Sequence, residues 1–421
     1  MKLRIWWQWV NSKPFYLRCF VFFLLIRPVA EQFYSLKSIS PLFSPLYWLG
    51  ALTLLFSVIG IINGKRIKSK LDRTFIFWAV LVVVSTTALY FSSSTILEYL
   101  NYATKLTIPV AVYYFLRVFI KDKVDFTGLL TTFLLSCIFP VGSILFGLIR
   151  GGYFAEGRFE GSYADVFNHA FYLSFGTITL LYHYVKSRSD NNSMKISSLL
   201  IVAGLVIAIA GLWIIKHIAT IAVFITVIVL FIYIVFRKKQ QAALLMIVLA
   251  LLFIFFTGDL FYQEVVNPRI EYEVEIIEGS RDVDQAVHGR MSRWTWLMGD
   301  FRSAPFMAKL AGYPLSLKRS THMINITPHN DFLRIMFFTG YAGLIFYIYF
   351  LYKGLKRVKY SDAPERFFIY AVIFSTILYS VTTVPTFYPG YVNILMIAFA
   401  YSALPVLRPV RNATAKNYHN R

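Results

Sequence analysis

The sequence predicts an all-α polytopic membrane protein with about twelve transmembrane helices. The chain has 421 residues, of which 57% are hydrophobic, 18% are aromatic and only 15% are charged. A soluble domain carries about 25% charged residues. The apolar residues form separate runs that are long enough to cross a bilayer, and basic clusters lie between these runs.

The basic clusters account for much of the formal net charge of +21. Such a charge can indicate nucleic-acid binding, but that function needs a soluble basic domain, which this sequence lacks. The clusters are short and follow apolar runs, which is typical of the cytoplasmic loops of an inner-membrane protein. We therefore expect the lipid bilayer as a partner and no nucleic acid.

Each predicted helix corresponds to an apolar run close to the ~20 residues that one span requires. The first run is interrupted by Arg18 and Arg27, and the ninth opens into a long polar segment. The predicted helices cover residues 14–34, 45–63, 74–92, 97–120, 126–149, 166–185, 196–215, 218–236, 241–257, 330–352, 366–384 and 390–408.

The basic clusters favour a single topology. They follow the even-numbered helices, as at residues 121–123 and 237–239. Because loops rich in lysine and arginine stay in the cytoplasm, both termini are predicted to be cytoplasmic. The turns after the odd-numbered helices are then predicted to face the periplasm.

Three regions are predicted along the chain. Residues 1–257 hold the first nine helices, residues 258–329 form a periplasmic loop domain, and residues 330–421 hold the last three helices. Within the loop, glutamates alternate with apolar residues over 271–276, and this period of two predicts a short strand.

A helix is predicted later in the loop, from Val287 to Phe301. Trp294 and Leu297 belong to a set of apolar residues that recur there at helical spacing. Arg290 and Arg293 are three residues apart, so both can project from one face of this helix.

The predicted periplasmic face carries many cations, although the positive-inside pattern disfavours them there. Arginine binds a diphosphate through paired hydrogen bonds, whereas lysine acts as a point charge. Such a set predicts a pocket for an anionic, lipid-linked group; the alternative is side chains that reach the headgroup level. The candidate binding residues are Arg158, Lys216, His217, Arg290, Arg293, Asn330, Asp331 and Arg334.

His329 is the candidate catalytic residue. It lies in a polar segment, residues 328–334, at the entrance of a membrane helix, where ionisable groups are costly and indicate function. Histidine has a pKa near neutrality, so it can take a proton from an attacking hydroxyl. Asn330 and Asp331 could orient it or a substrate. The alternative is a structural role, in which His329 caps the helix that follows Pro328.

No metal and no cofactor are predicted. Asp282 and Asp284 have the form of the metal-binding pair of nucleotide-sugar transferases, but nucleotide sugars are cytoplasmic and this pair is predicted on the other face. His288 and His322 lack the spacing of a zinc site. The sequence also contains no phosphate-binding glycine loop, nucleophile elbow or zinc-protease helix.

One segment resembles a known family. His329-Asn330, followed by nine residues, Gly340, two residues and Gly343, is similar to the signature of bacterial O-antigen ligases and the related Wzy-type O-antigen polymerases. This signature is shared by much of the superfamily, and it separates ligases poorly from polymerases.

Other parts of the chain resemble the same family. Gly289-Arg290 with Trp294, and Gly161 after Arg158, are similar to its periplasmic positions. The predicted order of helices and the long loop before the tenth helix match as well. The resemblance therefore covers nearly the whole chain.

The resemblance implies a GT-C-like glycosyltransferase in the bacterial cell inner membrane, with its site facing the periplasm. Such enzymes take a glycan from undecaprenyl diphosphate without metal or nucleotide. A ligase passes the glycan to a lipid A–core sugar, and a polymerase passes it to a second lipid-linked glycan. By this resemblance His329 would be the general base, Arg290 would contact the diphosphate, and Arg158 would lie near the same group.

The chain departs from the family pattern at two places. The family usually has an arginine in a Ser-Arg pair between the seventh and eighth helices, where this chain has Lys216-His217. Lysine keeps the charge but loses the two-pronged contact of arginine. The usual Pro-Asn after the Arg158 segment is also absent, and Asn168-His169 lies nearby instead.

The predicted function is therefore glycan transfer from undecaprenyl diphosphate to an acceptor sugar hydroxyl, with O-antigen ligase favoured over polymerase. The alternative of a different class is a secondary transporter or a polysaccharide-lipid flippase. A transporter needs ionisable residues near the bilayer midplane and repeat symmetry between its halves. Here the cations gather at one predicted face, which favours chemistry at the membrane surface.

Overall fold

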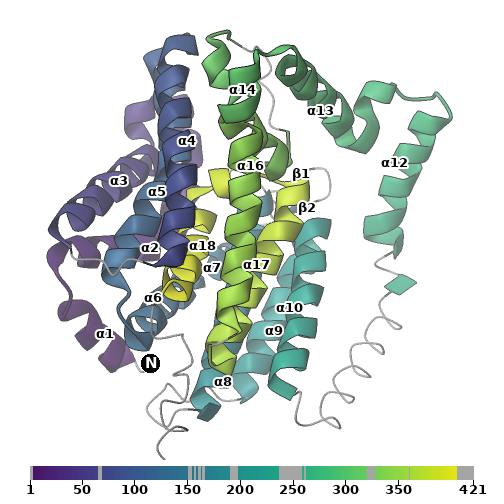
Figure 1. Cartoon of the computed structure of the whole chain (residues 1–421). Helices are drawn as coiled ribbons and strands as arrows, with labels where there is room; N and C mark the ends of the chain where they lie inside the picture. The colour runs from purple at the N-terminus through teal and green to yellow at the C-terminus, as the bar shows by residue number, and fades with distance from the viewer. Residues whose placement is uncertain are drawn as a thin grey trace, which may run out of the picture.

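The computed structural model describes residues 3–64, 69–149, 154–155, 158–159, 163, 166–189, 198–236, 258–259, 262–319, 328–359 and 361–404. Most of these residues are helical. The long helices run side by side in one bundle, and α13 (Ala286–Ser303) and α14 (Phe306–Ala311) lie at the end opposite to α1 (Leu3–Asn11) (Figure 1).

The first part of the chain supplies most of the bundle. Its further helices are α2 (Phe15–Gln32), α3 (Pro45–Asn63), α4 (Lys70–Ser92), α5 (Ile96–Phe119), α6 (Lys123–Ser136), α7 (Ile138–Ile149), α8 (Val166–Ser189), α9 (Ser198–Ile215) and α10 (Ile218–Phe236). Between α7 and α8, the two-residue strands β1 (Phe154–Ala155) and β2 (Arg158–Phe159) pair in antiparallel fashion.

The second part adds a peripheral helix and the end of the bundle. Its further helices are α12 (Asn267–Ile277), α16 (Asp331–Val358), α17 (Ala363–Thr382) and α18 (Pro389–Ser402). Short helical turns connect several elements: η1 (Tyr34–Ser38), η2 (Pro41–Phe43), η3 (Tyr262–Val266), η4 (Val283–Gln285), η5 (Tyr313–Ser316) and η6 (Pro385–Phe387).

The helices follow the predicted apolar runs closely within the described residues. α3 and α10 begin and end at the predicted residues. The predicted run 126–149 is divided into α6 and α7 because Pro140 has no N–H to bond the carbonyl of Ser136. The predicted ninth helix, residues 241–257, lies outside the described residues, and the division into three regions stays a prediction.

Among the residues that the structure describes, five helical segments are long and apolar enough to cross a membrane. They are Pro45–Asn63, Lys70–Ser92, Lys123–Gly147, Asp331–Val358 and Ala363–Thr382. Shorter apolar helices lie at Leu199–Ile215 and Ile218–Ile234. The chain is therefore an all-α membrane protein, and the count of twelve spans stays a prediction.

Large apolar side chains cover the outside of the bundle. Val80 and Val83 on α4 are 54% and 60% exposed, and Leu199 and Val206 on α9 are 77% and 59% exposed. An apolar surface of this extent is unfavourable in water and suits the hydrocarbon core of a bilayer.

Charged pairs join helix ends near α1. Lys13 pairs with Asp125, which also accepts a hydrogen bond from Trp9 Nε1 at 3.0 Å. Lys186 Nζ lies 3.3 Å from Glu365 Oε1. All of these residues belong to segments that the topology predicts to be cytoplasmic.

Polar contacts at the other end join the helix ends that are predicted to lie nearest the periplasm. Thr386 donates to Asp331 at 2.6 Å, and Tyr379 donates to Thr220 at 3.0 Å. The contacts therefore group the described segments by end, as the topology prediction requires. Which end faces the periplasm stays a prediction.

The strand predicted over residues 271–276 is wrong, because these residues belong to α12. Pro268 lies in the first turn, where its missing N–H costs no helical hydrogen bond. Asn267 Nδ2 donates to Glu271 Oε1, one turn along the helix, at 2.7 Å. The alternation spans only six residues, and no strand lies beside it in the part of the chain that the structure describes.

The helix predicted over residues 287–301 is confirmed as α13. Asp282 and Asp284 precede it and are exposed, with Asp284 in η4. His322 lies outside the described residues.

α16 is broken at Gly340, which has φ 71° and ψ −176°. This conformation is essentially restricted to glycine. A Cβ atom at Gly340 would lie 2.2 Å from the carbonyl oxygen of Leu310, so the residue also permits direct contact with the end of α14. The break separates residues 331–339, which carry the candidate site, from the longer second half of the helix.

Neighbouring elements pack closely around the break in α16. Gly312, with φ 126°, faces the Phe338 carbonyl oxygen, which would lie 2.1 Å from an added Cβ. The same carbonyl accepts a hydrogen bond from Ser85 on α4. At Gly343, an added Cβ would lie 1.9 Å from Thr339 Oγ1. Both glycines of the His-Asn…Gly…Gly pattern are thus required by close packing around the break.

Candidate functional site

The first turn of α16 is held by two residues that follow His329. Asn330 Oδ1 accepts a hydrogen bond from Leu333 N at 3.0 Å, so Asn330 is the N-cap of the helix. Asp331 is fully buried and accepts hydrogen bonds from Thr386 and Ser380. The capping role considered for His329 therefore belongs to Asn330, and Asp331 fixes the helix end to α17 and η6.

His329 lies just outside this cap and has φ 47°, in the left-handed region. Histidine is one of the residues that adopt this region more often than most. The preceding residue, Pro328, accepts a hydrogen bond through its carbonyl oxygen from Trp294 Nε1 at 2.6 Å. This bond attaches α13 to the site. Arg290 is four residues before Trp294 and so lies on the same face of α13.

The positive charges of three arginines act on His329. Burial and the positive charges of Arg290, Arg293 and Arg334 lower the pKa of His329 to about 4. The ring is therefore neutral at pH 7, and a neutral imidazole can accept a proton. The structure thus brings Arg290 and Arg293 together with His329 and Arg334, which lie more than 30 residues later in the sequence.

Arg334 projects from the first half of α16 into an aromatic environment. Its guanidinium carbon lies 4.6 Å from the ring centre of Phe387 and 5.8 Å from that of Tyr102. The side chain is buried, with 8% of its surface exposed. Contacts of this kind hold a guanidinium in a fixed position, and Arg334 also forms a hydrogen bond with Tyr102.

Lys216 and His217 form the turn between α9 and α10. His217 Nδ1 accepts a hydrogen bond from Thr220 N at 3.3 Å. Thr220 Oγ1 lies 2.6 Å from the same Nδ1 and accepts from Tyr379. Tyr379 is followed by Ser380, which contacts Asp331. This chain of contacts joins the turn to the end of the bundle that carries His329.

Of Arg158, the structure describes only the backbone. It lies in β2 and pairs with Ala155 in β1. The prediction that its side chain approaches the same anion concerns atoms outside what the structure describes, as does the prediction for Gly161.

A buried ion pair at this end of the bundle was not predicted from the sequence. Arg27 Nε lies 2.7 Å from Glu31 Oε1 on α2, and Tyr172 and Tyr388 both donate to Glu31. Tyr388 directly follows η6, which carries the Asp331 and Arg334 contacts. The available signal was an arginine and a glutamate four residues apart inside an apolar run.

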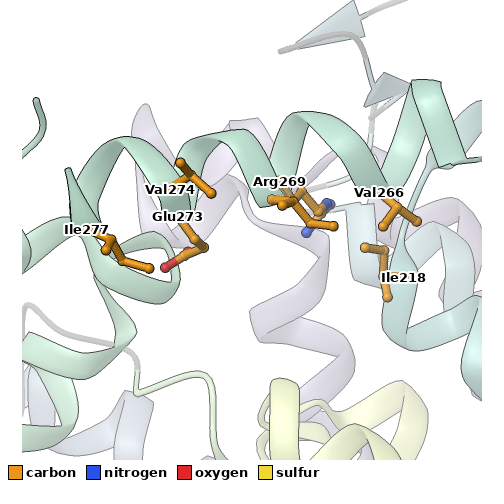
Figure 2. Close-up of a pocket in the computed structure, with 7 residues that line it drawn as sticks. Ile218, Val266, Arg269, Glu273, Val274 and Ile277 are labelled. Atoms are coloured by element: carbon orange, nitrogen blue, oxygen red, sulfur yellow. The ribbon is translucent and has the colours of Figure 1, made fainter.

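A groove of about 410 Å3 lies between α12 and the start of α10 (Figure 2). Ile218, Val266 and Val274 are among the apolar residues that line it, and Arg269 and Glu273 are its charged residues. Ile218 directly follows His217, so the groove begins next to the Lys216-His217 turn. It contains no side chain of the His329 cluster, which makes it a candidate for an apolar ligand group and not for the chemistry.

The arrangement combines one neutral base with several fixed cations at one end of a membrane bundle. It suits the removal of a proton beside a group that carries or develops negative charge. The described residues contain no cluster of side chains able to hold a metal ion. No protein-family model matches this chain, and no curated protein shows a significant match to it.

Proposed function

We propose that this protein is a periplasm-facing membrane glycosyltransferase that transfers a glycan from undecaprenyl diphosphate to an acceptor sugar hydroxyl. The observation that carries the proposal is the neutral His329 ring within the field of Arg290, Arg293 and Arg334. The resemblance of the His-Asn…Gly…Gly segment supports the same function.

The proposed reaction is a single inverting displacement. His329 takes the proton of the acceptor hydroxyl while the acceptor oxygen forms a bond to the anomeric carbon of the glycan. The bond between that carbon and the diphosphate oxygen breaks, and the electron pair leaves with undecaprenyl diphosphate. The arginines stabilise the charge that develops on this leaving group.

Donor binding is expected to improve the base. The arginine charges lower the pKa of His329, and a bound diphosphate would offset them. The histidine would then become a stronger base when the donor is in place. Without bound donor, His329 would be too weak a base to take protons from other groups.

The pH dependence of the reaction tests this coupling. Activity should fall as pH drops through the pKa of His329, because protonation removes the base. We expect this acid limb near pH 4 for kcat/KM, which reports the free enzyme, and at higher pH for kcat, which reports the complex. Arg290→Gln should move the kcat/KM limb upward, whereas Arg302→Gln, an exposed arginine on the same helix, should not. Coincident limbs in the wild-type enzyme would exclude the coupling.

Ligase and polymerase differ in the acceptor. We place O-antigen ligase first, with lipid A–core as the acceptor, and polymerase second, with another lipid-linked glycan as the acceptor. Lipopolysaccharide from a deletion strain separates them on a gel. Loss of all capped core indicates a ligase, core that carries a single repeat indicates a polymerase, and an unchanged pattern contradicts both.

A further inference from the structure

A second group of cations lies around Tyr102 on α5. Lys105 Nζ is 5.9 Å from the centre of this ring, and the Arg334 guanidinium carbon is 5.8 Å from the same centre. Lys37 on η1 lies close enough for its charge to act on Lys105. Tyr102 is buried, Lys105 is half-buried and Lys37 is exposed, so the group extends from the interior to the surface.

These cations form no ion pair with the acidic side chains that the structure describes, although the charge of Asp331 acts on Arg334. No described carboxylate lies within 4 Å of Lys37, Lys105 or Arg334. Asp331 acts on Arg334 without direct contact, and its oxygens accept hydrogen bonds from Thr386 and Ser380. Glu98 is bonded to Ser94 and faces Arg319 at 4.0 Å. Like charges at a partly buried site repel one another, and an anion would stabilise all three.

The group is distinct from the cations that surround His329. The charges that act on His329 are those of Arg290, Arg293 and Arg334. Those that act on Lys105 are Arg334 and Lys37. Arg334 is the common member, so one cation group lies toward α13 and the other toward α5 and η1. Two anions can therefore bind at one end of the bundle without sharing all of their contacts.

We propose that Lys37, Lys105 and Arg334 form a second anion subsite, which holds a phosphate group of the acceptor glycolipid. The proposal rests on the proposed function, in which Arg290 and Arg293 bind the diphosphate of the donor. Lysine side chains suit a single phosphate because they act as point charges and need no paired geometry. The subsite would hold the acceptor so that its hydroxyl approaches His329.

Binding of a lipid A–core glycolipid to the full-length protein in nanodiscs tests the subsite. The probe is used with its phosphates intact and after their chemical removal. Lys105→Gln should weaken binding of the intact probe about tenfold or more, since a charge-assisted contact is lost. Removal of the phosphates should weaken wild-type binding by a similar factor, and Lys105→Gln should then have no further effect. Equal binding of the intact probe by the wild type and Lys105→Gln overturns the proposal.

Other variants separate charge from structure. Lys105→Arg keeps the charge and should bind the intact probe within about threefold of the wild type. Lys309→Gln, on α14 at the same end, should have no effect. Lys37→Gln changes an exposed residue, so this variant should fold normally even if Lys105→Gln does not. It should weaken binding of the intact probe more than binding of the dephosphorylated probe.

The KM for the donor distinguishes the second anion subsite from the donor site. Lys105→Gln should leave the KM for the lipid-linked donor unchanged, and a raised donor KM with normal acceptor binding would overturn the assignment. If the wild type binds the glycolipid in a phosphate-dependent manner but transfers no glycan, the proposed function fails while the subsite stands. If it transfers glycan with no dependence on acceptor phosphate, the subsite fails alone.

Discussion

His329→Ala is expected to lower kcat for glycan transfer about 10²- to 10⁴-fold, the range associated with the loss of a general base. The KM for the lipid-linked donor should change little, because the arginines that would bind the diphosphate remain. His329→Gln should be similarly inactive, since an amide accepts hydrogen bonds but does not take up the proton. Initial rates of the purified variants in nanodiscs measure the effect.

Stability measurements separate this role from helix capping. Asn330 supplies the cap of α16, so Asn330→Ala should lower the free energy of unfolding by about 1 kcal/mol. His329→Ala should not lower it by a comparable amount. A His329→Ala protein that transfers glycan at the wild-type rate would exclude the base assignment.

Gly340→Ala is expected to destabilise the protein by about 3 kcal/mol or more. Alanine at this position must adopt φ 71° or straighten the helix, and its Cβ would collide with the Leu310 carbonyl oxygen. Straightening α16 would also move Arg334 relative to Phe387. Thermal unfolding in detergent, followed by intrinsic fluorescence, measures the change.

Gly142→Ala is the matched control. Gly142 lies within α7, and an added Cβ would have no neighbour within 4 Å. Alanine there should be neutral or stabilising by about 0.5–1 kcal/mol, because it reduces the freedom of the unfolded chain. Equal stability of Gly340→Ala and Gly142→Ala would show that the break does not need glycine.

The long helices of the bundle could be predicted because each corresponds to an apolar run that a bilayer must accommodate. α3 and α10 are bounded by polar or helix-breaking residues, and their limits were predicted to the residue. α12 was mispredicted because a short alternation of glutamates and apolar residues fits a strand only when a partner strand is present. α12 lies in a polar segment, so the length of a membrane span could not be used to correct this prediction.

The site could be predicted in part. The sequence indicated His329, Arg290, Arg293 and Arg334, because ionisable residues at a membrane helix end are costly. It did not indicate Lys105, which lies within a predicted span and shares with Arg334 a position beside the ring of Tyr102. Contacts of this kind depend on how α5 and α16 pack, and no sequence period records them.

Glycan transfer can be measured with the purified protein in nanodiscs, an undecaprenyl-diphosphate-linked glycan and a lipid A–core acceptor. We expect the wild-type protein to form capped core and an equal amount of free undecaprenyl diphosphate without added nucleotide, and the His329→Ala protein to form neither product. Intact donor after incubation with the wild-type protein, or movement of the donor across the bilayer without transfer, would contradict this expectation.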